Sequence, residues 1–200
     1  MNSEIMTVLS KQILVAVFVM MSTGALAGLQ EANEALAGKN YKAAIKELEP
    51  LAAQGDANAQ HLLADIYNNG SGVTMDEKLA VAWYRKAAAQ GFVNSQTMLG
   101  IMYENGAGVK LNYKTAMSWY RKAAEQGEPD AQSLLGAMYA EGLGVTADMV
   151  QALKWFTLAA NSGYEIGQQN IKAVEPKMTS KQIKRARTLA EEWKKAHTQK

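Results

Sequence analysis

Residues 99–109 read LGIMYENGAGV, residues 63–73 read LADIYNNGSGV and residues 135–145 read LGAMYAEGLGV. The three stretches share a tyrosine, two glycines and a valine at an offset of 36 residues. A fixed period of this length is the signature of a protein that stacks one supersecondary unit on the next. The chain of 200 residues is therefore interpreted as a repeat array.

The repeat continues on the C-terminal side of this stretch, where a tryptophan, an alanine pair and a glycine recur at the same offset. They define three repeats at about 59–94, 95–130 and 131–166, within a repeat region of residues 56–166. The recurring residues are Trp83, Trp119 and Trp155, then Ala87-Ala88, Ala123-Ala124 and Ala159-Ala160, then Gly91, Gly127 and Gly163.

Each copy has the pattern of a helix, a glycine loop and a second helix. In the first copy, Leu63 and Tyr67 share one helical face, and the loop glycine Gly70 suits the left-handed backbone at a helix exit. Asp76 is placed to cap the second helix, whose buried stripe is expected to contain Trp83. The sequence therefore predicts an all-α protein, an α-solenoid of antiparallel helix pairs with a 36-residue period.

This pattern resembles the Sel1-like repeats, which are related to the tetratricopeptide repeats. The resemblance covers residues 59–166. It rests on Leu63-x-x-x-Tyr67-x-x-Gly70-x-Gly72-Val73, on Ala80-x-x-Trp83-x-x-x-Ala87-Ala88-x-x-Gly91, and on the same residues one and two periods later.

Both ends of the array are expected to be caps. Residues 28–55 hold a degenerate N-terminal repeat, and residues 167–200 hold capping helices. Pro176 breaks the period, and residues 179–182 have the form of a capping box before a last amphipathic helix. Terminal elements with a polar outer side are what a solenoid requires.

The first 27 residues have the pattern of a secretory signal peptide. Lys11 precedes an apolar run from Ile13 to Met21, and Ala25-Leu26-Ala27 is a small-x-small cleavage site. We expect cleavage after Ala27 and a periplasmic or secreted mature protein. The alternative is that this segment is kept as a membrane anchor, although the run is short for a span of ~20 residues.

Composition excludes several functions. The chain has no cysteine, which excludes a disulfide framework, a thiolate zinc site and a cysteine nucleophile. The net charge of +2 argues against nucleic acid as a partner. The two histidines, His61 and His197, lie in no metal-ligand cluster, and the glycine loops lack the third glycine of a dinucleotide fingerprint. We expect a non-enzymatic protein without metal or cofactor.

The resemblance implies a binding function. In tetratricopeptide proteins, ligands usually contact variable positions of each repeat's first helix, on the concave face of the stack. We expect a protein or peptide partner there, and a polar or basic one, because the lining is polar and mildly acidic. The expected partner-binding residues are Asn58, His61, Asp65, Asn68, Asn69, Asn94, Thr97, Ile101, Glu104, Asn105, Asp130, Ser133, Ala137, Ala140 and Glu141.

Two further hypotheses remain open. In one, the groove binds or hydrolyses peptidoglycan fragments or β-lactams, with His61 and Asp65 as its polar centre. A cysteine-rich branch of the Sel1-like family is connected with such ligands, but this chain lacks the cysteines of that branch, so the resemblance does not carry the activity over. In the other, the basic C-terminal helix makes a peripheral contact with an anionic membrane or an acidic partner. Residues 172–200 have a net charge of +6 and residues 28–171 a net charge of −4. The ordinary interpretation of this basic end is a solvated helix face.

Overall fold

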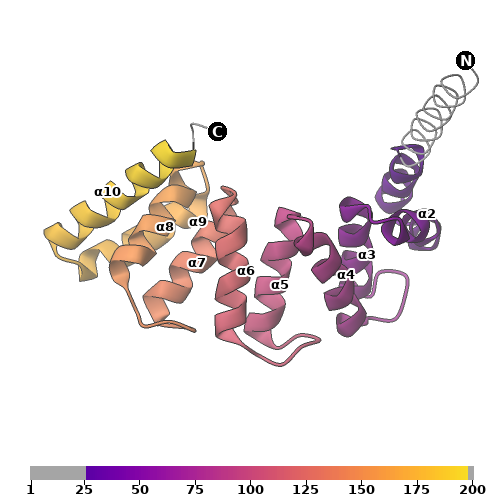
Figure 1. Cartoon of the computed structure of the whole chain (residues 1–200), viewed down its shortest axis with the longest axis horizontal. Helices are drawn as coiled ribbons and strands as arrows, with labels where there is room; N and C mark the ends of the chain where they lie inside the picture. The colour runs from indigo at the N-terminus through magenta and orange to yellow at the C-terminus, as the bar shows by residue number, and fades with distance from the viewer. Residues whose placement is uncertain (1–25, 198–200) are drawn as a thin grey trace, which may run out of the picture. The chain divides into compact units, whose positions relative to one another are not determined.

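The computed structural model describes residues 26–197, which are mostly helical (Figure 1). These residues contain no strand, which confirms the predicted all-α class. The predicted signal peptide, residues 1–27, lies outside the described residues except for Leu26 and Ala27. Across residues 26–197, no helix has both the length and the apolar character that a membrane span needs.

The 36-residue period reappears in the helices. First helices start every 36 residues from Ala57, and second helices start every 36 residues from Glu77. The chain forms a helix over residues 26–37, then α2 (Tyr41–Ala53), α3 (Ala57–Asn69), α4 (Glu77–Ala89), α5 (Val93–Asn105), α6 (Tyr113–Glu125), α7 (Pro129–Glu141), α8 (Met149–Asn161), α9 (Glu165–Val174), the short 3-10 helix η1 (Glu175–Lys177) and α10 (Ser180–His197).

The chain divides into two compact units after Asp76. The described part of the N-terminal unit contains the helix over residues 26–37, α2 and α3. Leu48 and Leu63 are fully buried in its core. Asp56 begins α3 by accepting a hydrogen bond from the Ala59 N–H at 2.8 Å, which satisfies a donor that the first helical turn leaves unpaired.

The C-terminal unit extends from Glu77 and contains α4 to α10. Each helix from α4 to α9 packs against the next, and α10 packs against α8 (Figure 1). Gly106 and Gly142 end α5 and α7 in the left-handed conformation, with φ of 72° and 74°. Asp148 then caps α8 through hydrogen bonds from the Val150 and Gln151 N–H groups.

In α4 and α6 the buried aromatic residue lies one position after the tryptophan, whereas in α8 both Trp155 and Phe156 are buried. Tyr120 is fully buried, whereas Trp83 and Trp119 are only half-buried, so the prediction that these two tryptophans lie in the buried stripe is wrong. In α6 the reason is the glycine on the facing helix: a Cβ atom on Gly100 would overlap the Tyr120 ring. The tyrosine ring fills the space that the glycine leaves.

The second glycine of each loop holds consecutive repeats together. Gly108 has a φ of 65°, and a Cβ atom there would lie 2.5 Å from the backbone of Glu77 at the start of α4. The Gly108 N–H also donates to Glu77 Oε2 at 2.9 Å. Only glycine allows both this conformation and this approach. The loop of one repeat therefore packs on the second helix of the repeat before it.

A repeated glutamine makes a second set of connections. Gln96 donates through Nε2 to the Ala88 carbonyl, and Gln132 donates to the Ala124 carbonyl, both at 3.2 Å. These carbonyls lie in the last turn of α4 and α6, where the helix itself supplies few partners. Both glutamines are buried. The glutamines therefore connect α4 to α5 and α6 to α7.

Candidate partner-binding face

The expected partner-binding residues differ in burial. One repeat position, occupied by His61, Thr97 and Ser133, is buried in all three copies, with exposed fractions of 9%, 6% and 4%. This position is therefore largely closed to solvent. Asn69, Asn94, Asn105 and Glu141 are exposed, and the half-buried residues are Asn58, Asp65, Asn68, Ile101, Glu104, Asp130, Ala137 and Ala140.

In the N-terminal unit, α3 brings His61 and Asp65 together. His61 Nε2 lies 3.4 Å from Asp65 Oδ2, one helical turn away. Burial lowers the pKa of His61, and the negative charge of Asp65 partly offsets this effect. No group of three metal-ligating side chains occurs within residues 26–197. The pair is a polar contact, and burial, not Asp65, is what favours a neutral His61 at neutral pH.

In the C-terminal unit, two tyrosine hydroxyls hold two carboxylates. Tyr120 of α6 donates to Glu104 Oε2 of α5 at 2.5 Å, and Tyr164 donates to Asp130 Oδ1 of α7 at 2.8 Å. Burial raises the pKa of Tyr120, and the hydrogen bond and negative charge of Glu104 raise it further. Burial and Asp130 raise the pKa of Tyr164 to about 12. Both tyrosines therefore stay protonated and keep donating at physiological pH.

These carboxylates belong to one electronegative region. The negative charge of Asp130 also raises the pKa of Tyr120, and that of Glu128 raises the pKa of Tyr164. We call Glu104, Glu128 and Asp130 the acidic row. All three are half-buried, and no ion pair within the described part of the chain neutralises them. The row can accept hydrogen bonds from a lysine or arginine of a partner.

Two polar residues outside the expected set adjoin this region. Asn170 of α9 donates through Nδ2 to Ser133 Oγ at 3.0 Å, and Tyr164 precedes α9. Neither residue occupies a repeat position that the sequence pattern marks as variable. Their role follows only from the packing of α9 on α7 and α8.

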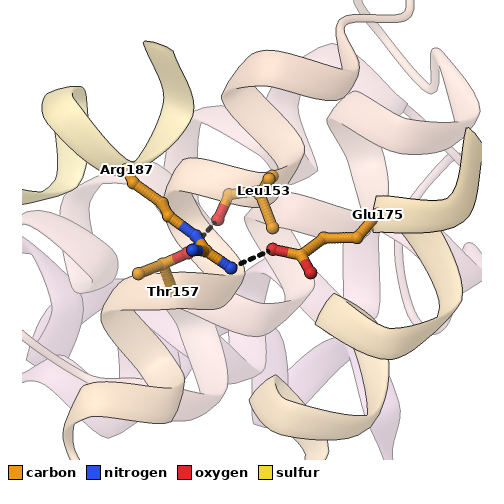
Figure 2. Close-up of polar contacts among 4 residues, drawn as sticks. All are labelled: Leu153, Thr157, Glu175 and Arg187. Atoms are coloured by element: carbon orange, nitrogen blue, oxygen red, sulfur yellow. Dashed lines mark hydrogen bonds and ion pairs between the residues drawn. The ribbon is translucent and has the colours of Figure 1, made fainter. Parts of the chain in front are cut away.

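The C-terminal helix closes the last repeat. Figure 2 shows Arg187 of α10 pointing toward Glu175, whose Oε1 accepts a hydrogen bond from Nη2 at 2.6 Å. The Trp193 ring packs edge-on against Trp155, with centroids 6.1 Å apart. An open hollow of about 690 Å³ runs along one side of α10, and its lining contains both cations, such as Lys184, and carboxylates, such as Glu191. Its mixed charge gives no preference for anions.

The Sel1 repeat family model matches residues 57–92, 93–128 and 129–164. A solved Sel1 repeat protein from Oxalobacter formigenes is 37% identical over 74% of this chain and 59% of its own, with a TM-score of 0.67.

A protective antigen of uropathogenic Escherichia coli with an SLR fold is 31% identical over 84% of this chain and 45% of its own, with a TM-score of 0.60. This chain thus spans less than two thirds of either protein. No curated protein matches it. Proteins with this fold are generally protein-interaction scaffolds and are typically non-enzymatic. The three matched repeats and the likeness of the helices show that the chain belongs to the Sel1 repeat family.

Proposed function

We propose that this protein is an exported interaction scaffold that binds a basic segment of a partner protein on the first-helix face of its C-terminal unit. The observation that carries the proposal is the acidic row. Two of its carboxylates are held in fixed positions by tyrosine hydroxyls, yet remain half-exposed. Hydrogen bonds between a charged donor and a carboxylate are about twice as strong as neutral ones, so such a row selects lysine or arginine.

The arrangement of the row favours a protein partner. Glu104 lies at the end of α5, and Glu128 and Asp130 lie at the start of α7, so the charges come from two successive repeats. We expect an extended or helical segment of the partner to cross both repeats and contact all three. Ordered carboxylates lower the entropic cost of binding, because their side chains are already immobilised.

Export is the second part of the proposal. It is supported by the apolar run from Ile13 to Met21 and by the Ala25-Leu26-Ala27 cleavage pattern. The absence of cysteine is compatible with either a reducing or an oxidising compartment, so it does not oppose export. The partner is then expected in the cell envelope or outside the cell.

Capture from an envelope extract tests the binding site. The baits are the purified protein, a Glu104→Gln/Asp130→Asn variant and a control variant, Glu191→Gln/Glu192→Gln. Both variants lose two negative charges, but the control loses them on α10. The amide oxygens of the first variant can still accept the tyrosine hydrogen bonds, which preserves the fold.

The proposal predicts a protein that the purified protein and the control recover and that the Glu104→Gln/Asp130→Asn variant does not. Thermal melts of all three baits exclude unfolding as the reason. Recovery of the same proteins by all three baits, or of none by any, would show that the acidic row is not the binding site.

A further inference from the structure

The second helices carry a sequence difference that coincides with a structural one. In the first two repeats they contain Trp83-Tyr84-Arg85-Lys86 and Trp119-Tyr120-Arg121-Lys122. In the third repeat the same positions are Trp155-Phe156-Thr157-Leu158. The second residue of each set is an aromatic residue buried in the core. The third and fourth residues are two cations in the first two sets and uncharged in the last.

In α4 and α6, aromatic groups hold these cations in place. The Lys86 ammonium lies 3.7 Å from the Trp83 ring centroid, and the Lys122 ammonium lies 4.1 Å from that of Trp119. Arg121 donates to the Tyr139 hydroxyl at 2.8 Å, as Arg85 does to that of Tyr103. All four cations are exposed, and no ion pair within residues 26–197 neutralises them.

In the third repeat the same face is covered by α10. Leu158 stands at the lysine position and is 3% exposed, and Trp155 is 4% exposed. Ala186, Ala190 and Trp193 form the stripe of α10 that packs there. Glu175 follows Tyr139 by one period, and Arg187 of α10 donates to it (Figure 2). The amphipathic helix α10 therefore covers a face of α8. The corresponding face of α4 and α6 is exposed at the lysine position.

We infer that the uncovered face of α4 and α6 binds an acidic amphipathic helix of a partner protein. We call this the basic face; it consists of Lys78, Trp83, Arg85, Lys86, Lys114, Trp119, Arg121 and Lys122. The docked α10 shows that a helix fits this repeat position. The cations that replace Thr157 and Leu158 require the opposite charge on the partner. Ala82 and Ser118, both exposed and small, lie one turn before the arginine and lysine and let a helix axis approach closely.

The basic face and the acidic row are formed by different helices and have opposite charge. A basic segment that suits the acidic row is repelled by the basic face, and an acidic helix is repelled by the acidic row. The inference is therefore independent of the proposed function: it requires a second partner of the opposite charge, on the second-helix side of the C-terminal unit.

A synthetic peptide based on α10 provides the probe. The peptide has the sequence of residues 180–197 with every lysine and arginine replaced by glutamate, which keeps the stripe of Ile183, Ala186, Ala190 and Trp193. The same peptide with its natural basic residues is the matched control. Both peptides are titrated into the purified protein by calorimetry at low salt, where charge complementarity contributes most. We expect the dissociation constant of the acidic peptide to be lower than that of the basic peptide by about tenfold or more.

Two variants of equal charge locate the binding site. Lys86→Glu/Lys122→Glu reverses two charges on the basic face, and Lys181→Glu/Lys184→Glu reverses two on the exposed side of α10. We expect the first variant to weaken binding of the acidic peptide about tenfold or more and the second to leave it within about twofold. Circular dichroism checks that both variants keep the helical content of the parent.

The inference is wrong if the acidic peptide does not bind, or if the two variants weaken its binding equally, because binding would then reflect net charge alone. Vesicles containing phosphatidylglycerol are tested in parallel. If the protein binds these vesicles through Lys86 and Lys122 while ignoring the peptide, the basic face contacts a lipid surface instead of a helix.

Discussion

The Tyr120 hydroxyl donates a 2.5 Å hydrogen bond to Glu104, so a fully buried core ring also positions a carboxylate of the acidic row. Tyr120→Phe removes this bond and keeps the ring. We expect it to lower the free energy of unfolding by about 1 kcal/mol. Tyr120→Ala also leaves a cavity next to Gly100 and is expected to cost about 3–5 kcal/mol.

Urea denaturation measures both variants, with Trp119→Ala as the comparison. Trp119 is only half-buried, so its removal should cost less than Tyr120→Ala. A larger loss for Trp119→Ala would contradict the assignment of Tyr120 as the core residue.

Alkaline pH should destabilise the C-terminal unit through its tyrosines. The pKa of Tyr164 is raised from 10.0 to about 12, and that of Tyr120 is raised above its usual value as well. Above about pH 10 the unfolded chain loses these protons while the folded chain keeps them. The stabilisation is therefore complete below pH 10 and is lost as the pH rises. The urea concentration at the unfolding midpoint should decrease between about pH 9 and about pH 11. This decrease should be smaller for the double variant Tyr120→Phe/Tyr164→Phe than for the parent protein.

Acid pH should destabilise the N-terminal unit through His61. Burial lowers the pKa of His61 from 6.5, so below that pH the unfolded chain binds a proton that the folded chain does not. The contribution of neutral His61 to the free energy of unfolding is complete above about pH 6.5 and is lost as the pH falls toward the pKa of His61 in the folded state. His61→Gln should remove this part of the pH dependence, as measured by thermal melts between about pH 7 and about pH 5. An unchanged slope would show that His61 is not the group responsible.

The contact between α10 and α8 can be tested at Leu158, which is buried beneath α10. Leu158→Lys places a cation under the helix and removes apolar packing, and we expect a loss of about 2–4 kcal/mol. The reverse change on α6, Lys122→Leu, concerns an exposed position and should stay within about 0.5 kcal/mol. Hydrogen exchange should accelerate in α10 of the first variant only. Equal protection of α10 in both variants would contradict the role of Leu158.

Export is checked by the intact mass of the protein recovered from outside the cytoplasm. Cleavage after Ala27 gives a chain that begins at Gly28. A mass that retains residues 1–27 would establish the anchored form instead.

Sequence periodicity is sufficient to predict the helical repeat, because the glycines and alanines that recur are the residues whose size the packing demands. Gly100 must be small because the Tyr120 ring occupies the space in front of it. The same pattern does not separate Trp119 from Tyr120, because adjacent aromatic residues both recur with the period and differ by only about 100° around the helix.

The candidate site is less accessible to prediction. Variable positions of the first helices include Glu104 and Asp130, but also the buried Ser133, because variation between repeats does not report burial. Tyr164 and Asn170 reach the site from the segment after the last full repeat, where the period no longer guides an alignment. The docking of α10 on α8 is likewise not predictable from the pattern, since an amphipathic stripe shows that a helix is covered but not which helix covers it.

The exchange of Arg-Lys for Thr157-Leu158 also restricts how an array of this kind can lengthen. A duplicate of residues 93–128 has the exposed cations Arg121 and Lys122 on its second helix and can follow another copy of itself without exposing a leucine at this position. A duplicate of residues 129–164 would leave one copy of Leu158 facing water, because a single α10 covers a single such repeat. Duplication of an internal repeat is therefore tolerated, whereas duplication of the last repeat is unfavourable because it exposes a leucine to water.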